Sequence, residues 1–377
     1  MVKFFKPVVF SALLAVTVLP FGVQAHEGKA VHEGKAAHEG KAESALKVAL
    51  WGDEFYADDA EVKSRNIEQT IDSMNKHHLD FTIFAGDTKN GHTPCTDEAI
   101  TTDVVTIFNS LKAPTMYTVG DNEWTDCHRT SNGSMDPLDR LALIRSYFFS
   151  KSTTQGTKPI PVIRQGESGQ AYSENSRFVK NNVEFVALHI PGSNNNLVAT
   201  KKQCTNKSTR GAWDDATDMP VPGTDCAAAS EEYEARNAKN IEWLKAAFQE
   251  ARDYHYAGIL IVIQADVFTP FELADGGYEA DFLPSLDAKN GYTDFVKTLT
   301  AETHNYDGQV VLVHGDSHYF RIDKAMVDVD DNPDTDDRQT PNFTRVEVFG
   351  SADNSWIEMT VDPKSANVFD FKPVIIQ

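Results

Sequence analysis

The sequence has few basic residues, few cysteines and, beyond residue 25, no long apolar run. Lys and Arg number 35 against 56 Asp and Glu, which gives a formal net charge of −21 at pH 7. Because an acidic surface repels phosphate backbones, we expect no general nucleic-acid binding. The lack of apolar runs excludes a membrane-spanning helix after residue 25. The hydrophobic fraction of 41% is nevertheless typical of a globular protein with a core.

The first 25 residues have the pattern of a secretory signal peptide, with an uncleaved anchor as the alternative. Lys3 and Lys6 precede the apolar run 8–19, and Val23-Gln24-Ala25 offers small residues to a signal peptidase. The run is short for a membrane-spanning helix. We therefore predict an exported protein, periplasmic or extracellular, with no membrane attachment after cleavage.

Export permits disulfides, and the cysteines form an even set of four. Three pairings are possible, and we favour Cys95–Cys127 together with Cys204–Cys226. The first two cysteines each follow a Gly-Asp pair within eight residues, and the other two would close a polar loop. All four are too widely spaced for a zinc knuckle.

Residues 26–42 contain the pentapeptide HEGKA in three copies at a period of six. The tract has no strongly apolar residues for a core, so we interpret 26–44 as a linker. Metal capture by the three repeat histidines is the functional alternative, since imidazole binds transition metals. The remainder, 45–377, shows no internal linker and is predicted to be one domain.

Apolar runs alternate with helical patterns along this predicted domain. The expected strands are 46–51, 81–85, 115–119, 178–179, 183–190, 259–263, 310–313, 319–322, 344–349 and 356–361, and the expected helices are 59–76, 96–111, 229–253 and 291–303. A long polar loop is expected over 191–229. Strands that alternate with helices indicate an α/β sheet, and the alternating pattern of the last strands indicates a second sheet.

Five of the expected strands are followed by an aspartate. These aspartates are Asp53, Asp87, Asp121, Asp266 and Asp316. Ligands of open α/β sheets bind outside the carboxyl ends of the strands. Clustered carboxylates there need cations, and oxygen ligands suit Mg²⁺, Mn²⁺ or Ca²⁺. His318 adds a nitrogen ligand that also suits Zn²⁺ or Fe. For any single Gly-Asp pair, the alternative is a turn capped by the aspartate side chain.

The order of these turns resembles the calcineurin-like metallophosphoesterases. The matching stretches are Gly86-Asp87, Gly120-Asp121-Asn122-Glu123 and Gly315-Asp316-Ser317-His318. The signature of that family is D-x-H, G-D, G-N-H-[ED], a lone His and G-H-x-H, all at strand ends. The resemblance covers about residues 46–325 and implies a two-sheet αββα sandwich, an α/β fold with helices outside two mixed sheets. It also implies metal-dependent hydrolysis of a phosphate monoester or diester.

The chain departs from this family at four histidine positions. The residues present are Phe55, Asn122, Asp266 (with Gln264 as the alternative) and Asp316. The resemblance then implies two divalent ions, chosen from Mn, Mg, Ca, Fe and Zn. One lies at Asp53, Asp87 and His318 with a ligand missing. The other lies at Asp87, Asp121, Asp266 and Asp316, an all-oxygen set that favours a hard cation.

The candidate catalytic groups follow the third motif. Asn122 is expected to donate to the phosphoryl oxygens, and Glu123, Asp126 or His128 to protonate the leaving group. The competing hypothesis is a non-catalytic relative that keeps the scaffold for binding or for metal storage.

Three further features have structural alternatives. Asn194 and Asn195 are either substrate donors or a polar turn. The acidic stretch 328–337 alternates like a calcium loop but lacks the turn glycine and the closing glutamate, which favours a solvated loop. His314 is expected, by strand alternation, to face away from the fifth motif.

Overall fold

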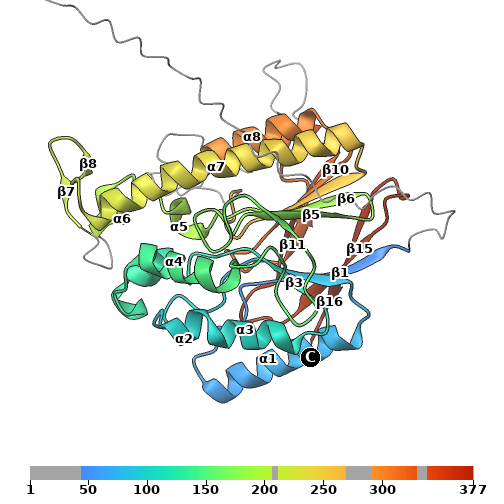
Figure 1. Cartoon of the computed structure of the whole chain (residues 1–377), viewed down its shortest axis with the longest axis horizontal. Coiled ribbons are helices and arrows are strands. Elements are labelled where there is room, and N and C mark those ends of the chain that lie inside the picture. The colour runs from blue at the N-terminus through green and yellow to red at the C-terminus, as the bar shows by residue number, and fades with distance from the viewer. Residues whose placement is uncertain (1–43, 206–210, 269–289, 329–337, 377) are drawn as a thin grey trace, which may run out of the picture. The chain divides into compact units, whose positions relative to one another are not determined.

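The structure, a computed structural model, describes residues 44–205, 211–268, 290–328 and 338–376 (Figure 1). The signal peptide, the HEGKA tract and residues 329–337 of the acidic stretch lie outside these ranges. The division into signal peptide, linker and domain therefore stays a prediction.

Helices and strands alternate through most of the described chain. The helices are α1 (Ala60–Lys76), α2 (Asp97–Ile100), α3 (Thr102–Ser110), η1 (Thr125–His128), η2 (Thr130–Asn132), α4 (Pro137–Phe148), α5 (Gly192–Asn195), α6 (Lys201–Thr205), α7 (Asp225–Tyr254) and α8 (Thr293–His304). The strands are β1 (Leu46–Trp51), β2 (Phe81–Phe84), β3 (Thr115–Tyr117), β4 (Ile163–Arg164), β5 (Ser176–Lys180), β6 (Val183–Ala187), β7 (Trp213–Asp214), β8 (Met219–Pro220), β9 (Gly258–Val262), β10 (Gln309–His314), β11 (Arg321–Asp323), β12 (Val327–Asp328), β13 (Arg338–Gln339), β14 (Phe343–Glu347), β15 (Trp356–Val361) and β16 (Phe369–Val374). None of these helices has the length and apolar character needed to cross a membrane.

Two mixed sheets form the centre of the fold. One has the strand order β16-β15-β1-β2-β3, and the other has the order β11-β14-β10-β9-β6-β5-β4. Strands β1, β2 and β3 run parallel in the first sheet, as do β6, β9, β10 and β14 in the second. Leu50, Ile83, Leu260 and Val313 belong to the apolar core between the sheets.

Helices cover the outer face of each sheet (Figure 1). Leu244 and Phe248 of α7 and Leu299 of α8 share a core with the seven-stranded sheet. On the five-stranded sheet, a second outer core joins Trp51 to residues of α1, α3 and α4. Successive side chains of a strand point to opposite faces, so each sheet contributes to two cores. This four-layer arrangement confirms the predicted two-sheet αββα sandwich.

The predicted strands and helices have counterparts in the structure, but some elements were missed. The predicted loop 191–229 contains α5, α6, β7 and β8, and α7 begins earlier than expected. Helix α4 was also missed, although Asp136 caps its first turn and Pro137 occupies its first position. Those two residues are an ordinary helix-start signal that sequence analysis can detect.

Both predicted disulfides are confirmed. Cys95 and Cys127 are bonded with Cα atoms 5.7 Å apart, and Cys204 and Cys226 with Cα atoms 5.5 Å apart. The first bond joins the chain after β2 to η1 and so connects the segments that follow Asp87 and Asp121.

Glu184 gives a testable pH dependence of stability. Its carboxylate is buried on β6, with Arg177 Nη1 3.4 Å away. Burial raises its pKa to about 8, and Arg177 offsets this only in part because Glu250 shares that guanidinium. The native state thus holds this proton more tightly than the unfolded chain does. The contribution of Glu184 to the free energy of unfolding is therefore complete below about pH 4.5 and is lost as pH rises through about 8.

We expect Glu184→Gln to raise the free energy of unfolding by about 1–2 kcal/mol at pH 8 and by much less at pH 5. Urea unfolding at both pH values measures this difference, with Glu242→Gln on the surface of α7 as the control. An equal effect of Glu184→Gln at the two pH values would contradict a raised pKa of Glu184.

Candidate functional site

Four of the five strand-end aspartates meet where the two sheets come together. Asp53, Asp87 and Asp121 are buried, and Asp316 is partly exposed. The Asp316 backbone N–H donates to Asp53 Oδ2 at 3.0 Å and so links β1 of one sheet to β10 of the other. The predicted convergence of these turns is therefore present in the structure.

Two glycines make this close approach possible. A Cβ on Gly315 would lie 1.6 Å from Asp53 Oδ2. A Cβ on Gly192 would lie 2.8 Å from Asp121 Oδ2 and 2.7 Å from Asp316 Oδ1. Any larger residue at either position would push a carboxylate out of the group.

Among the described residues, carboxyl groups outnumber cationic side chains in this group. Burial is the main cause that raises the pKa of Asp53, Asp87 and Asp316, the last to about 8. The neighbouring carboxylates add to each shift, with Asp121 the largest such contributor for both Asp87 and Asp316. Lys89 is a buried cation nearby, but burial lowers its pKa as well. Such a set has the charge and the oxygen donors to hold a hard divalent cation.

His318 is oriented as metal-binding histidines are. Its Nδ1 lies 2.6 Å from Ser351 O, so Nδ1 carries a hydrogen and donates it to that carbonyl. In the neutral ring, Nε2 then keeps its lone pair, and this atom lies 3.7 Å from Asp53 Oδ1. A backbone carbonyl that fixes the tautomer in this way is the usual outer partner of a histidine ligand.

Asp87 is held by donors that the sequence did not reveal. Tyr56 donates its hydroxyl to Asp87 Oδ2 at 2.9 Å, and Asn122 Nδ2 donates to the same oxygen at 2.7 Å. The Asn122 backbone N–H donates to Oδ1 at 3.1 Å. A metal ion at Asp87 would have to share these oxygens. Tyr56 follows Phe55, which packs into the core against Trp51 and leaves the tyrosine next to the site.

The two alternatives for the fourth motif, Gln264 and Asp266, have different contacts in the structure. Gln264 Nε2 donates to Asp316 Oδ1 at 3.2 Å, and Gln264 Oε1 accepts from the Gly192 backbone N–H. The Asp266 backbone N–H donates to Asp316 Oδ2, and the charge of its carboxylate contributes to the raised pKa of Asp316. The Asp266 carboxylate is instead paired with Arg321. Gln264 is thus the residue whose side chain enters the group of aspartates.

Two of the predicted leaving-group acids have other contacts. Glu123 is fully buried, and its Oε1 accepts from Tyr117 Oη at 3.0 Å and from the Gly120 backbone N–H at 2.8 Å. His128 Nδ1 lies 2.6 Å from Thr125 O within η1. Both contacts are those of a folded turn, and the catalytic roles of the two residues stay predictions.

A left-handed turn borders the site. Ser193, Asn194, Asn195 and Asn196 all have φ between 49° and 65°, a conformation that asparagine tolerates but that costs a residue such as Ser193 about 1–2 kcal/mol. The Asn194 and Asn195 side chains bond to Leu197 O and Gly291 O, as expected of a polar turn. The turn places Ser193 Oγ 2.7 Å from Asp121 Oδ2, with Arg129 Nη2 3.3 Å from the same hydroxyl. Strained backbone held in place at a site is a recognised sign of function.

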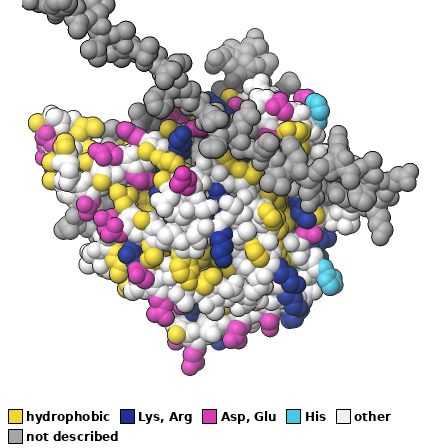
Figure 2. Space-filling model, in the orientation of Figure 1, with side chains coloured by type: hydrophobic (Ala, Val, Ile, Leu, Met, Phe, Trp, Pro, Cys, Tyr) yellow, Lys and Arg dark blue, Asp and Glu magenta, His cyan; other side chains and the backbone are white. Residues whose placement is uncertain are grey.

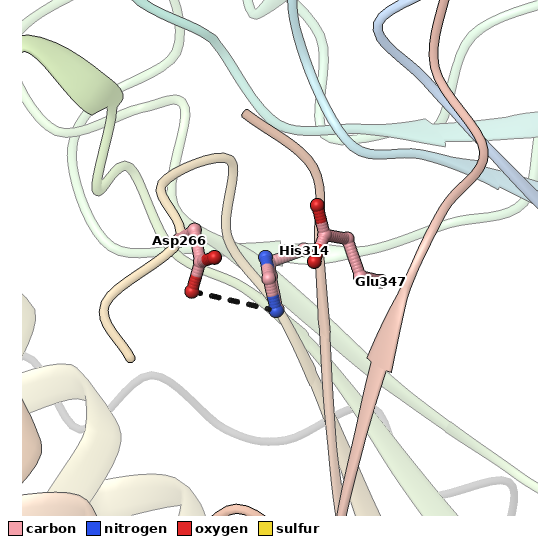
Figure 3. Close-up of side chains that lie close together, drawn as sticks. All are labelled: Asp266, His314 and Glu347. Carbon is pink, nitrogen blue, oxygen red and sulfur yellow. Dashed lines mark ion pairs between the residues drawn. The ribbon is translucent and has the colours of Figure 1, made fainter. Parts of the chain in front are cut away.

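A separate cluster lies beside this group. Asp266, His314 and Glu347 place their ligand atoms within 4.8 Å of one another (Figure 3). Among the described residues, this is the set of three potential metal ligands that meets this distance. The carboxylate oxygens of the strand-end aspartates are therefore spread more widely. On the surface shown in Figure 2, by contrast, acidic side chains are scattered and not gathered into one patch.

No protein-family model and no curated protein matches this chain. Among solved structures, it is similar to GAP50, described as the anchor in the inner membrane complex of Plasmodium. That match has a TM-score of 0.40 and 10% identity over 89% of this chain and 90% of the other. It is also similar to the 5'-nucleotidase from Candida albicans SC5314, with a TM-score of 0.36 and 12% identity over 89% of this chain. That match spans 52% of the nucleotidase chain, about half its length.

Proposed function

We propose that this chain is an exported, metal-dependent phosphoesterase that hydrolyses a small phosphate monoester or diester. The supporting observation is the group formed by Asp53, Asp87, Asp121 and Asp316 at the strand ends of both sheets, where burial and neighbouring carboxylates raise the pKa of Asp53, Asp87 and Asp316. His318, with its Nε2 lone pair, and Gln264 complete the set of donors. Both disulfides are compatible with export.

The residues around the group have distinct tasks in this proposal. A divalent ion, when bound, would supply the Lewis acid and the activated water of the reaction. Arg129, with 26% of its side chain exposed, would bind the phosphoryl oxygens beside Ser193. The burial and the nearby aspartates that raise the pKa of Tyr56 keep its hydroxyl protonated. Because the raised pKa makes it a weak acid, Tyr56 would act as a hydrogen-bond donor to a phosphoryl or leaving-group oxygen and would keep its own proton.

The test is turnover of an activated aryl phosphate with Mn²⁺, Mg²⁺, Ca²⁺, Zn²⁺ or Fe²⁺ added singly. We expect Asp87→Asn to lower kcat/KM by a factor of about 100 or more, because the carboxylate would help to hold the metal and accepts two hydrogen bonds from Asn122. Asp72→Asn, an exposed change on α1, should leave turnover unchanged. Thermal melting of both variants separates loss of function from loss of fold. Full activity in Asp87→Asn would refute the proposed site.

A non-catalytic metal-binding relative is the second candidate function. It is favoured by the side chains of Tyr56 and Asn122, which already occupy Asp87 Oδ2, and by the replaced motif histidines. Bound metal in elemental analysis, together with no turnover for any ion and substrate, would support this candidate over the enzyme.

A further inference from the structure

A row of polar side chains crosses three strands of the seven-stranded sheet. Glu347 of β14 is paired in register with Arg321 of β11 on one side and with His314 of β10 on the other. Val313 and Val346, the neighbours of this row along the strands, point into the core between the sheets. The row therefore faces the outer side, as expected for His314 from alternation.

His314 carries an unpaired ring nitrogen into this row. The side chain is fully buried, and its Nδ1 lies 2.9 Å from Gly315 O, to which it donates a hydrogen. Nε2 then has a lone pair and, among the residues that the structure describes, no hydrogen-bond partner. Figure 3 shows this atom directed at Asp266, whose Oδ1 is 4.0 Å away. A lone pair that faces a carboxylate in a buried place is unfavourable unless a positive charge lies between them.

Arg321 supplies the positive charge in the structure. Its Nε donates to Glu347 Oε2 at 2.7 Å, and its Nη2 is paired with Asp266 Oδ2. Arg345 lies farther away, with Nη1 3.8 Å from Asp266 Oδ1, and is itself paired with Asp323. The two carboxylates are thus bridged by one guanidinium. Arg321 is 25% exposed, so its side chain has a route to solvent.

We propose that Asp266, His314 and Glu347 form a second divalent-metal site, which Arg321 closes in the metal-free protein. One imidazole and two carboxylates suit Zn²⁺ and similar borderline ions, and a carbonyl already fixes the tautomer of the histidine. Metal binding releases Arg321 toward solvent, because both cations compete for the same carboxylate oxygens. The site is distinct from the group of four aspartates and does not depend on hydrolysis.

Calorimetric titration of the full chain with Zn²⁺ tests this proposal. Arg321→Ala removes the competing guanidinium, and we expect it to tighten the binding of one Zn²⁺ at least about tenfold. Arg252→Ala is the matched control, since Arg252 is 29% exposed and is also paired with a carboxylate, that of Glu302. It should titrate as the wild type does. Because the variants differ at single sites, other zinc ligands of the chain contribute equally to all titrations.

The double variant Arg321→Ala/His314→Gln should lose the gain in affinity. Arg321→Ala/Glu347→Gln provides the same test with an isosteric change, should the loss of His314 disturb folding. A gain that survives both double variants, or no gain in Arg321→Ala, overturns the proposal. Asp87→Asn combined with Arg321→Ala should keep the gain, and its loss there would show that the two sites are not separate. Absence of phosphoesterase activity leaves each of these outcomes unchanged.

Discussion

Replacing Arg236 with methionine is expected to lower the free energy of unfolding by about 3–5 kcal/mol. Arg236 is fully buried on α7 and pairs with Glu232 through Nε and Nη2. Its Nη1 donates to Asn195 Oδ1 and to His189 O, and its Nη2 donates to Asn195 O. Methionine would fill much of the volume but would leave the carbonyls and the Glu232 carboxylate without their donor.

Arg236→Met is also expected to disturb the left-handed turn at residues 193–196. Because the bonds from Arg236 hold Asn195 in its left-handed conformation, their removal lets the strained backbone relax. Gly192 and Ser193 would then leave Asp121 and Asp316. Urea unfolding measures the stability, and Arg65→Met on the exposed face of α1 is the control. A change in the free energy of unfolding below about 1 kcal/mol would mean that the turn does not depend on the hydrogen bonds from Arg236.

Local signals in the sequence were sufficient for the central strands of both sheets and for their shared edge, but not for strands such as β16. Apolar runs of four to six residues, each ended by a polar turn, marked β1, β2, β9 and β10 because a buried strand needs apolar side chains on both faces. The aspartates after these strands were therefore expected to meet, and the pairing Cys95–Cys127 followed from the same geometry. Contacts fixed by chain direction and by strand ends can be predicted from short stretches.

Contacts that depend on the three-dimensional path of distant segments could not be predicted. Gln264 and Asp266 are two residues apart, and their side chains differ in partner: Gln264 bonds to Asp316, whereas Asp266 pairs with Arg321 and accepts from the Phe268 backbone N–H. Tyr56 reaches Asp87 because Phe55 turns into the core, with φ of 70° at Phe55. The turn at Ser193 is stabilised by Arg236, 43 positions along the chain, in addition to the local tolerance of asparagine for the left-handed conformation.

Asp53→Asn is expected to stabilise the metal-free protein by about 1–3 kcal/mol at pH 8. Burial, and next the charge of Asp316, raise the pKa of the fully buried Asp53. The carboxylate therefore costs stability, and this cost grows as pH rises above the ordinary range of an aspartate. Asparagine removes the charge and keeps an oxygen for the Asp316 backbone N–H. His318 Nε2 lies 3.7 Å from Asp53 Oδ1, so the amide nitrogen of the introduced asparagine would take the place of that oxygen and face the Nε2 lone pair.

The same substitution is expected to weaken metal binding, so its effect on stability should reverse when metal is added. Thermal melting in EDTA should give a higher Tm for Asp53→Asn than for the wild type, with a smaller difference at pH 4. In saturating Mn²⁺ the wild type should gain more, because a ligand that binds only the folded state stabilises it by mass action. Asp103→Asn on α3 serves as the exposed control. If Asp53→Asn lowers the Tm in EDTA at pH 8, the negative charge of the carboxylates is already balanced by other groups of the protein. The charge argument for a metal site then fails.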